Sequence, residues 1–169
     1  MSFKTLLIDP SLCTGCRTCE MACSLYHEGA CSPQLSRTRV IKFEAQGKNF
    51  PTACSHCSKP QCLTACDQGA ISVQRSTGAV VVDEARCTGC RSCLTACPQS
   101  MISFHPQRKV ALKCDLCGGD PQCARFCPTG AIAYAPVDQF VMARRRELAS
   151  RSLREGISST ESQKSVQAV

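Results

Sequence analysis

The chain has 169 residues, of which seventeen are Cys, and it contains no Trp, two Tyr and six Phe. A chain of this length can form one domain, but it lacks the large side chains that normally fill a core of that size. So many cysteines point to a disulfide scaffold, a multi-zinc protein or an iron–sulfur protein. The formal net charge of +7 counts every Cys as neutral, so it is no evidence for a nucleic acid partner if the thiols bind metal.

The first ten residues hold one Lys and only a three-residue apolar run, so no secretory signal is visible. No stretch approaches the roughly 20 apolar residues that cross a bilayer. We therefore expect a cytoplasmic protein with no membrane span. Because the reducing cytosol does not maintain many structural disulfides, the disulfide scaffold is the weakest of the three interpretations.

Sixteen of the cysteines fall into four runs of four, and Cys31 is left over. The first and third runs have the spacing C-x2-C-x2-C-x3-C, and the other two are the same run with a middle gap of four or five residues. In chain order the runs are Cys13, Cys16, Cys19 and Cys23; Cys54, Cys57, Cys62 and Cys66; Cys87, Cys90, Cys93 and Cys97; and Cys114, Cys117, Cys123 and Cys127.

Short β-rich segments surround these quartets. Residues 69–83 predict a hairpin with its turn at Ser76–Gly78, and residues 101–112 predict a second hairpin with its turn near Pro106. Residues 5–9 and 130–135 are each too short to form a sheet alone, so we expect them to pair with each other.

The spacing of the quartets favours iron–sulfur clusters over zinc. Three thiolates on one tight loop reach three corners of a 4Fe-4S cube, and the fourth Cys, three residues further on, points toward a second cube. Zinc sites instead use two Cys pairs a dozen or more residues apart. Clusters held in this way come in pairs that exchange their fourth ligands.

The remaining candidates have simpler explanations. We expect Cys31 to be an ordinary buried or half-buried residue, and His27, His56 and His105 to form hydrogen bonds beside complete quartets. Residues 31–53 are basic and poor in Cys, and they are either a partner surface or a solvated loop and strand.

Beyond Pro136 the composition changes. Residues 136–155 predict a basic amphipathic helix that docks on another chain or on its own core, and residues 156–169 predict a disordered tail. The arginines of this segment lack interleaved aromatics, so we expect no nucleic acid partner.

The four quartets, with Pro98 and Pro128 following the third and fourth, resemble the four-cluster ferredoxin-like subunits of molybdenum and tungsten oxidoreductases. The compact length is closest to the small soluble subunits of tungsten aldehyde oxidoreductase or carbon monoxide dehydrogenase systems. The resemblance covers residues 1–135 and implies an α+β fold of two nested dicluster units. The inner unit would span about 50–112, and the outer unit about 1–30 and 113–135.

Four quartets can be paired in three ways, and both the central hairpin and this resemblance favour the nested pairing. The ligand sets would then be Cys13, Cys16, Cys19 and Cys127; Cys54, Cys57, Cys62 and Cys97; Cys87, Cys90, Cys93 and Cys66; and Cys114, Cys117, Cys123 and Cys23. All sixteen ligands are present, which predicts four 4Fe-4S clusters.

The resemblance implies a non-catalytic subunit that passes single electrons between a molybdenum or tungsten catalytic subunit and a second redox partner, such as a flavin- or NAD-binding subunit. A further copy of the same chain is another expected partner, because the apolar strip of the predicted helix 136–155 would dock on another chain. The alternatives are a stand-alone polyferredoxin, an electron-transfer partner of carbon monoxide dehydrogenase or hydrogenase, and, more distantly, a zinc-stabilised binding module.

Overall fold

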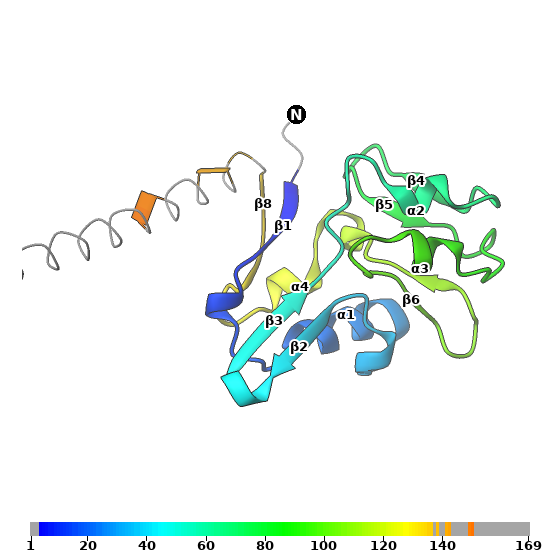
Figure 1. Ribbon diagram of the computed structural model, residues 1–169. Coiled ribbons are helices and arrows are strands. Elements are labelled where there is room, and N and C mark those ends of the chain that lie inside the picture. The colour runs from blue at the N-terminus through cyan, green and yellow to red at the C-terminus, as the bar shows by residue number, and fades with distance from the viewer. Residues whose placement is uncertain (1–3, 137, 139–140, 143–148, 151–169) are drawn as a thin grey trace, which may run out of the picture.

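The computed structural model describes residues 4–136, 138, 141–142 and 149–150 (Figure 1). The helix predicted for 136–155 and the tail at 156–169 lie outside these residues, apart from the isolated positions just given and Pro136. The strands and α-helices are β1 Lys4–Ile8, α1 Thr18–Glu28, β2 Arg39–Phe43, β3 Lys48–Thr52, α2 Gln61–Thr64, β4 Ile71–Val73, β5 Val80–Val82, α3 Ser92–Ala96, β6 Ser103–Phe104, β7 Ala111–Leu112, α4 Gln122–Arg125 and β8 Ile132–Pro136.

Within the described residues the strands form four separate two-stranded antiparallel sheets. The two predicted hairpins are present as β4–β5, with Ile71 opposite Val82, and as β6–β7. The predicted pairing of the two end segments is also confirmed, because β1 lies beside β8 with Ile8 opposite Ile132 (Figure 1). Alternating apolar residues in short segments were therefore a sufficient signal for these strands.

The segment 31–53 contains a full hairpin, where we had expected a loop and one strand as one of two alternatives. Strands β2 and β3 pair from Arg39 opposite Thr52 to Phe43 opposite Lys48, and Gly47, at φ 60°, closes the turn between them. The hairpin is tied to α1 because Glu20, which is 2% exposed, accepts a hydrogen bond of 2.6 Å from the Val40 amide. A long-range contact of this kind leaves no local pattern in the sequence.

Each helix begins between the second and third Cys of a quartet, so the four helices repeat along the chain. Helix α1 runs for eleven residues, whereas the other three make one turn or little more. Helix α1 packs against α4, and α2 packs against α3. Two groups result, which we call the outer half (β1, α1, β2, β3, α4, β8) and the inner half (α2, β4, β5, α3, β6, β7) (Figure 1).

The core is divided into three small clusters, and cysteine is a large part of each. Besides small aliphatic residues, one cluster contains Cys62 and Cys93, the second contains Cys19 and Cys123, and the third contains Cys54 and Cys114. No helix among the described residues has the length and apolar character that crossing a membrane requires.

An ionic network joins the two halves. The Glu28 carboxylate, whose side chain is 5% exposed, lies at the end of α1 and accepts hydrogen bonds of 2.8 and 3.1 Å from Arg108 of the β6–β7 connection. His105 approaches the same carboxylate at 3.6 Å, and Arg37 at 4.0 Å. The hydrogen bond from Arg108 holds the pKa of Glu28 below its ordinary value.

We predict that Glu28→Gln lowers the free energy of unfolding of the cluster-loaded protein by about 2 kcal/mol at pH 7, the value typical of a hydrogen bond to a charged group. For a protein of this size that is a fall of about 4–8 °C in the denaturation midpoint. Since the folded-state pKa of Glu28 is depressed, this stabilisation is complete at neutral pH and disappears only as the pH falls through that depressed pKa. Thermal denaturation followed by circular dichroism measures the fall.

Glu44→Gln is the matched control for this measurement, because Glu44 is an exposed carboxylate at the tip of the β2–β3 hairpin. An equal effect of the two substitutions would show that the network at Glu28 does not hold the halves together.

Candidate iron–sulfur centres

The loops of the first and third quartets have the same backbone conformation. Gly15 and Gly89 both have φ of 72°, and Arg17 and Arg91, each directly after the second Cys, have φ of 61° and 67°. Left-handed residues on both sides of the second Cys curl the loop back on itself. The third Cys then lies in the first turn of the helix, so three thiols of one quartet converge.

The two glycines are also places of close approach. A Cβ atom on Gly89 would lie 2.3 Å from the Lys109 carbonyl oxygen, and one on Gly15 would lie 2.4 Å from the Asn49 side-chain oxygen. Lys109 lies in the β6–β7 connection and Asn49 in β3. Each cysteine loop is therefore seated against a hairpin, which explains why glycine is needed there.

The second and fourth quartets use other left-handed residues to turn. His56 has φ of 48°, and in the fourth quartet Leu116, Cys117 and Gly118 have φ of 59°, 48° and 67°. The Asp115 carboxylate accepts a hydrogen bond of 2.9 Å from the Cys117 amide and supports this turn. Most of the longer middle gap of these quartets lies before the helix, which begins one residue ahead of the third Cys.

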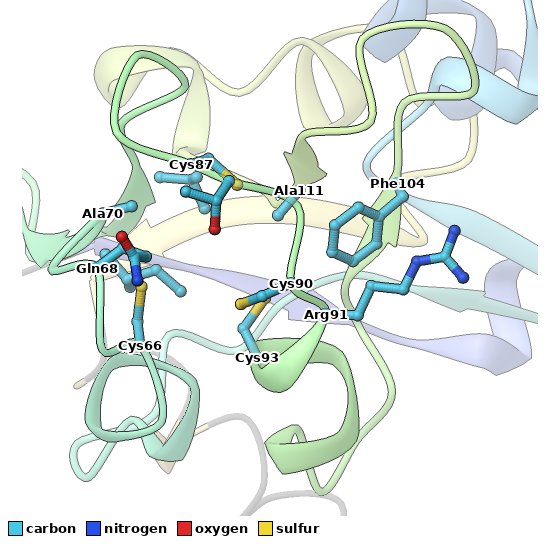
Figure 2. Close-up of a pocket in the computed structure, with 12 residues that line it drawn as sticks. Cys66, Gln68, Ala70, Cys87, Cys90, Arg91, Cys93, Phe104 and Ala111 are labelled. Atoms are coloured by element: carbon cyan, nitrogen blue, oxygen red, sulfur yellow. The ribbon is translucent and has the colours of Figure 1, made fainter.

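One cavity of the inner half is lined by three cysteines of the third quartet and by the last cysteine of the second. Figure 2 shows Cys66, Cys87, Cys90 and Cys93 arranged around this cavity, with Cys66 on the segment that follows α2. Ile71, Val82 and Phe104 complete its apolar wall. Four thiols in a mainly apolar cavity are a donor set that suits a thiolate-ligated cluster.

Two other cavities repeat this arrangement. A second cavity of the inner half is lined by the first three cysteines of the second quartet and the last of the third, namely Cys54, Cys57, Cys62 and Cys97. A cavity of the outer half is lined by the first three cysteines of the first quartet and the last of the fourth, namely Cys13, Cys16, Cys19 and Cys127.

The remaining four cysteines also lie near one another. The pKa of Cys123 rises above its ordinary value because the thiol is buried and because Cys114, Cys23 and Cys117 are close enough to act on it. Three cavities thus each combine three cysteines of one quartet with the last cysteine of another, and Cys23 lies near the cysteines of the fourth quartet.

The electrostatics of the cysteines fit a metal cluster. Burial raises the pKa of Cys93 to about 11 and that of Cys114 to about 12, and neighbouring cysteines add to both shifts. Several buried thiolates close together would repel one another, so a cation must compensate them. Iron in a cluster supplies that positive charge.

Hydrogen bonds to sulfur complete the candidate sites. The Arg37 amide donates to Cys23 at 3.3 Å, and the Met101 amide donates to Cys97 at 3.4 Å. Such bonds stabilise charge on a ligating sulfur and adjust the reduction potential of a cluster. The donor set, the burial and these bonds therefore all suit 4Fe-4S clusters.

The three histidines have hydrogen-bond or ion-pair partners. His27 lies 3.5 Å from the Cys117 sulfur and 3.3 Å from the Asp115 carboxylate, so the three could hold a metal together, but Cys117 already belongs to the fourth quartet. His105 faces Glu28. His56 accepts a hydrogen bond from the Val80 amide at 3.0 Å and lines the cavity of Cys54.

Cys31 is exposed, so our expectation of a buried or half-buried residue was wrong. It follows the Gly29 cap of α1, where the chain leaves the helix and turns along the surface toward β2. Small size and low polarity favour burial of Cys, but the local chain path decided otherwise.

Sequence reasoning missed two charged residues close to the sites. Lys113 is buried, at 3% exposure, and lines the cavity of Cys54. The Arg37 side chain, at 13% exposure, bonds to Asp115 at 3.1 Å beside the fourth quartet. The one local signal for Lys113 was its place between the apolar Leu112 and the ligand candidate Cys114.

Comparison with known proteins places this protein in a family. The model of the 4Fe-4S dicluster domain matches residues 45–137, and the model of the 4Fe-4S binding domain matches residues 6–24.

Three relatives are similar over most of this chain. The polyferredoxin-like subunit of aliphatic sulfonate oxidoreductase from Pyrococcus furiosus is 43% identical over 122 residues, which are 72% of this chain and 70% of that protein. A component of the anaerobic dimethyl sulfoxide reductase of Escherichia coli is 35% identical over 78% of this chain and 73% of its own length. The beta subunit of NADH-dependent phenylglyoxylate dehydrogenase from Aromatoleum evansii is 31% identical over 79% of this chain, but over only 30% of that subunit.

This protein therefore belongs to the 4Fe-4S dicluster domain family, and it is a ferredoxin-like iron–sulfur protein of the electron-transfer type found in oxidoreductase complexes.

Proposed function

We propose that this protein holds four 4Fe-4S clusters and passes single electrons between the molybdenum- or tungsten-containing catalytic subunit of an oxidoreductase and a second redox partner. The observation that carries the proposal is the grouping of the cysteines: three cavities each combine three cysteines of one quartet with the last cysteine of another, and Cys23 lies with the fourth quartet. The ligand sets are those predicted by the nested pairing.

In this function the protein binds, separates and insulates the clusters. The loop residues with left-handed backbone conformation bring three thiols of one quartet together. The helix that follows each loop places the fourth cysteine near the neighbouring site. Apolar residues such as Ile71, Val82 and Phe104 line the cavity, so the sulfurs would lie in a largely apolar environment. When bound, a 4Fe-4S cluster accepts and gives up one electron, and its potential depends on this environment.

The contact between Cys54 and Cys114 supports a route between the two halves. Both thiols belong to one core cluster with Ala79 and Leu116, and the charge of Cys54 acts on Cys114. Cys54 belongs to an inner ligand set and Cys114 to an outer one. Electrons would then cross between the halves at this junction, with the other two clusters toward the ends of the route.

The relatives support a complex with a catalytic subunit. Two are subunits of reductases or oxidoreductases for small molecules, and a third belongs to an NADH-dependent dehydrogenase. We propose a tungsten aldehyde oxidoreductase as the catalytic partner and a flavin- or NAD-binding subunit as the other. Purification from the native host under anaerobic conditions tests this: a stable complex with both partners is expected, whereas a free protein that reduces several unrelated enzymes would identify a stand-alone polyferredoxin.

We predict about sixteen iron atoms per protein molecule, four for each cluster, and a loss pattern that reveals the exchange of ligands. Cys66→Ala should remove the same cluster as Cys90→Ala, because both line one cavity. The double variant Cys66→Ala/Cys90→Ala should therefore lose no more cluster signal than either single variant, whereas Cys66→Ala/Cys57→Ala should lose two clusters. Iron and sulfide analysis with electron paramagnetic resonance measures the losses.

Cys31→Ala is the control for these substitutions, because Cys31 is exposed and belongs to none of the quartets. It should leave all four clusters in place. If the pair Cys66 and Cys57 behaved as one site and the pair Cys66 and Cys90 as two, the exchange of fourth ligands would be disproved.

We also predict that the clusters supply most of the folding free energy. The core clusters consist largely of cysteines and small aliphatic residues, and metal binding to such a site is coupled to folding. Anaerobic removal of iron with a chelator should abolish the cooperative unfolding transition seen by circular dichroism, and iron with sulfide should restore it. A cooperative transition in the iron-free protein would contradict this expectation.

A further inference from the structure

Lys113 is a buried cation at the junction of the two halves. It follows β7, whose residues Ala111 and Leu112 are buried, and it is itself 3% exposed. Its ammonium group donates a hydrogen bond to the carbonyl oxygen of Val80 in β5. The side chain is therefore fixed between β5 and the start of the fourth quartet.

Among the described residues, this cation has no carboxylate partner. No Asp or Glu oxygen in that part of the chain lies within 4.0 Å of the Lys113 ammonium group. Glu84 and Asp115 line the cavity on one side of Lys113, but both pair with Arg37, at 3.8 and 3.1 Å. An unpaired buried ammonium group is strongly unfavourable, so the site requires another anion.

The thiols of one proposed ligand set are the groups that can supply that anion. Lys113 lines the cavity of Cys54, Cys57, Cys62 and Cys97. The ammonium group of Lys113 and these four thiols therefore share one cavity. His56 lines the same cavity and accepts a hydrogen bond of 3.0 Å from the Val80 amide, so it supplies no negative charge.

The cations at the other proposed sites are different. Arg17 and Arg91 line the cavities of Cys13 and Cys87, but both residues are exposed. Arg37, beside the fourth quartet, is paired with carboxylates. Among the described residues, Lys113 is the one lysine or arginine that is buried. Its charge is thus screened less than that of any other cation near a site.

We infer that Lys113 is the counter-ion of the cluster bound by Cys54, Cys57, Cys62 and Cys97, and that its charge raises the reduction potential of this cluster above those of the other three. The inference rests on the proposed function. Reduction there adds one electron from the donor partner and one negative charge, with no bond made or broken. A fixed positive charge in a region of low dielectric constant stabilises that added charge. Electrons would then be held at the junction between the halves.

The test is a redox titration of the anaerobically purified holoprotein, followed by electron paramagnetic resonance. Lys113→Met removes the charge and keeps the length and apolar stem of the side chain. Lys59→Met is the matched control, because Lys59 lies in the loop of the same quartet but is exposed. Cys57→Ala, which alters this cluster alone, assigns its signal.

We expect Lys113→Met to lower the equilibrium constant for reduction of the assigned cluster at least tenfold, which is about 59 mV for one electron. The other three signals should shift less, and Lys59→Met should leave the assigned signal within a factor of about two, as expected for a screened surface charge. In the unaltered protein the assigned cluster should be the first to be reduced. An unchanged potential in Lys113→Met, or reduction of another cluster first, would overturn the inference.

If Lys113→Met failed to load the assigned cluster, Lys113→Arg and Lys113→Gln would decide the matter. The arginine variant keeps the charge and should keep the potential, whereas the glutamine variant keeps a hydrogen-bond donor and should lower it. Equal shifts in both would mean that packing acts rather than charge, and the inference would be wrong. A native protein without 4Fe-4S signals would instead refute the proposed function, so the two failures are distinguishable.

Discussion

The convergence of four thiols on one cavity is the interaction on which the rest of this structure depends. The thiols of a cavity come from positions that are distant in the sequence, such as Cys13 and Cys127, so each site also acts as a cross-link between segments. The four sheets of the described residues have two strands each, and a two-stranded sheet is barely stable alone. With so few large apolar residues in the sequence, the cysteine sites must hold these pieces together.

The two halves meet through two kinds of contact. In the first, the carboxylate of Glu28 interacts with Arg108, His105 and Arg37. These ion pairs link α1 of the outer half to the β6–β7 connection of the inner half. In the second, Cys54 and Cys114 share a core cluster. The first contact fixes the relative position of the halves, and the second brings their proposed clusters together. In the proposed function, structural stability and electron transfer would therefore depend on the same interface.

The proposed sites differ in the charged and polar groups that surround them, although their ligands are all cysteines. Exposed arginines beside two of the cavities are screened by water, whereas the ammonium group of Lys113 is buried and, among the described residues, has no carboxylate oxygen within 4.0 Å. Hydrogen bonds from the amides of Arg37 and Met101 reach single sulfurs in other places. Because all four proposed ligand sets consist of cysteine, the potentials of the proposed clusters would differ only through their surroundings.

The sequence by itself determined the cysteine loops, the hairpins at 69–83 and 101–112 and the pairing of the two end segments. The loops and hairpins follow from the spacing of the cysteines and the alternation of apolar residues, which are patterns among residues close in the sequence. The two end segments are each too short to form a sheet alone, so they pair with each other. The repeat and its resemblance also predicted that one quartet's last cysteine joins another quartet's first three, and three cavities are lined in this way. The burial of Lys113, the network at Glu28, the second strand within 31–53 and the exposure of Cys31 were decided by the tertiary structure alone. Each of these depends on which distant segment covers a side chain, and the local sequence carries little of that information: only Lys113 had a local signal, its place between Leu112 and Cys114.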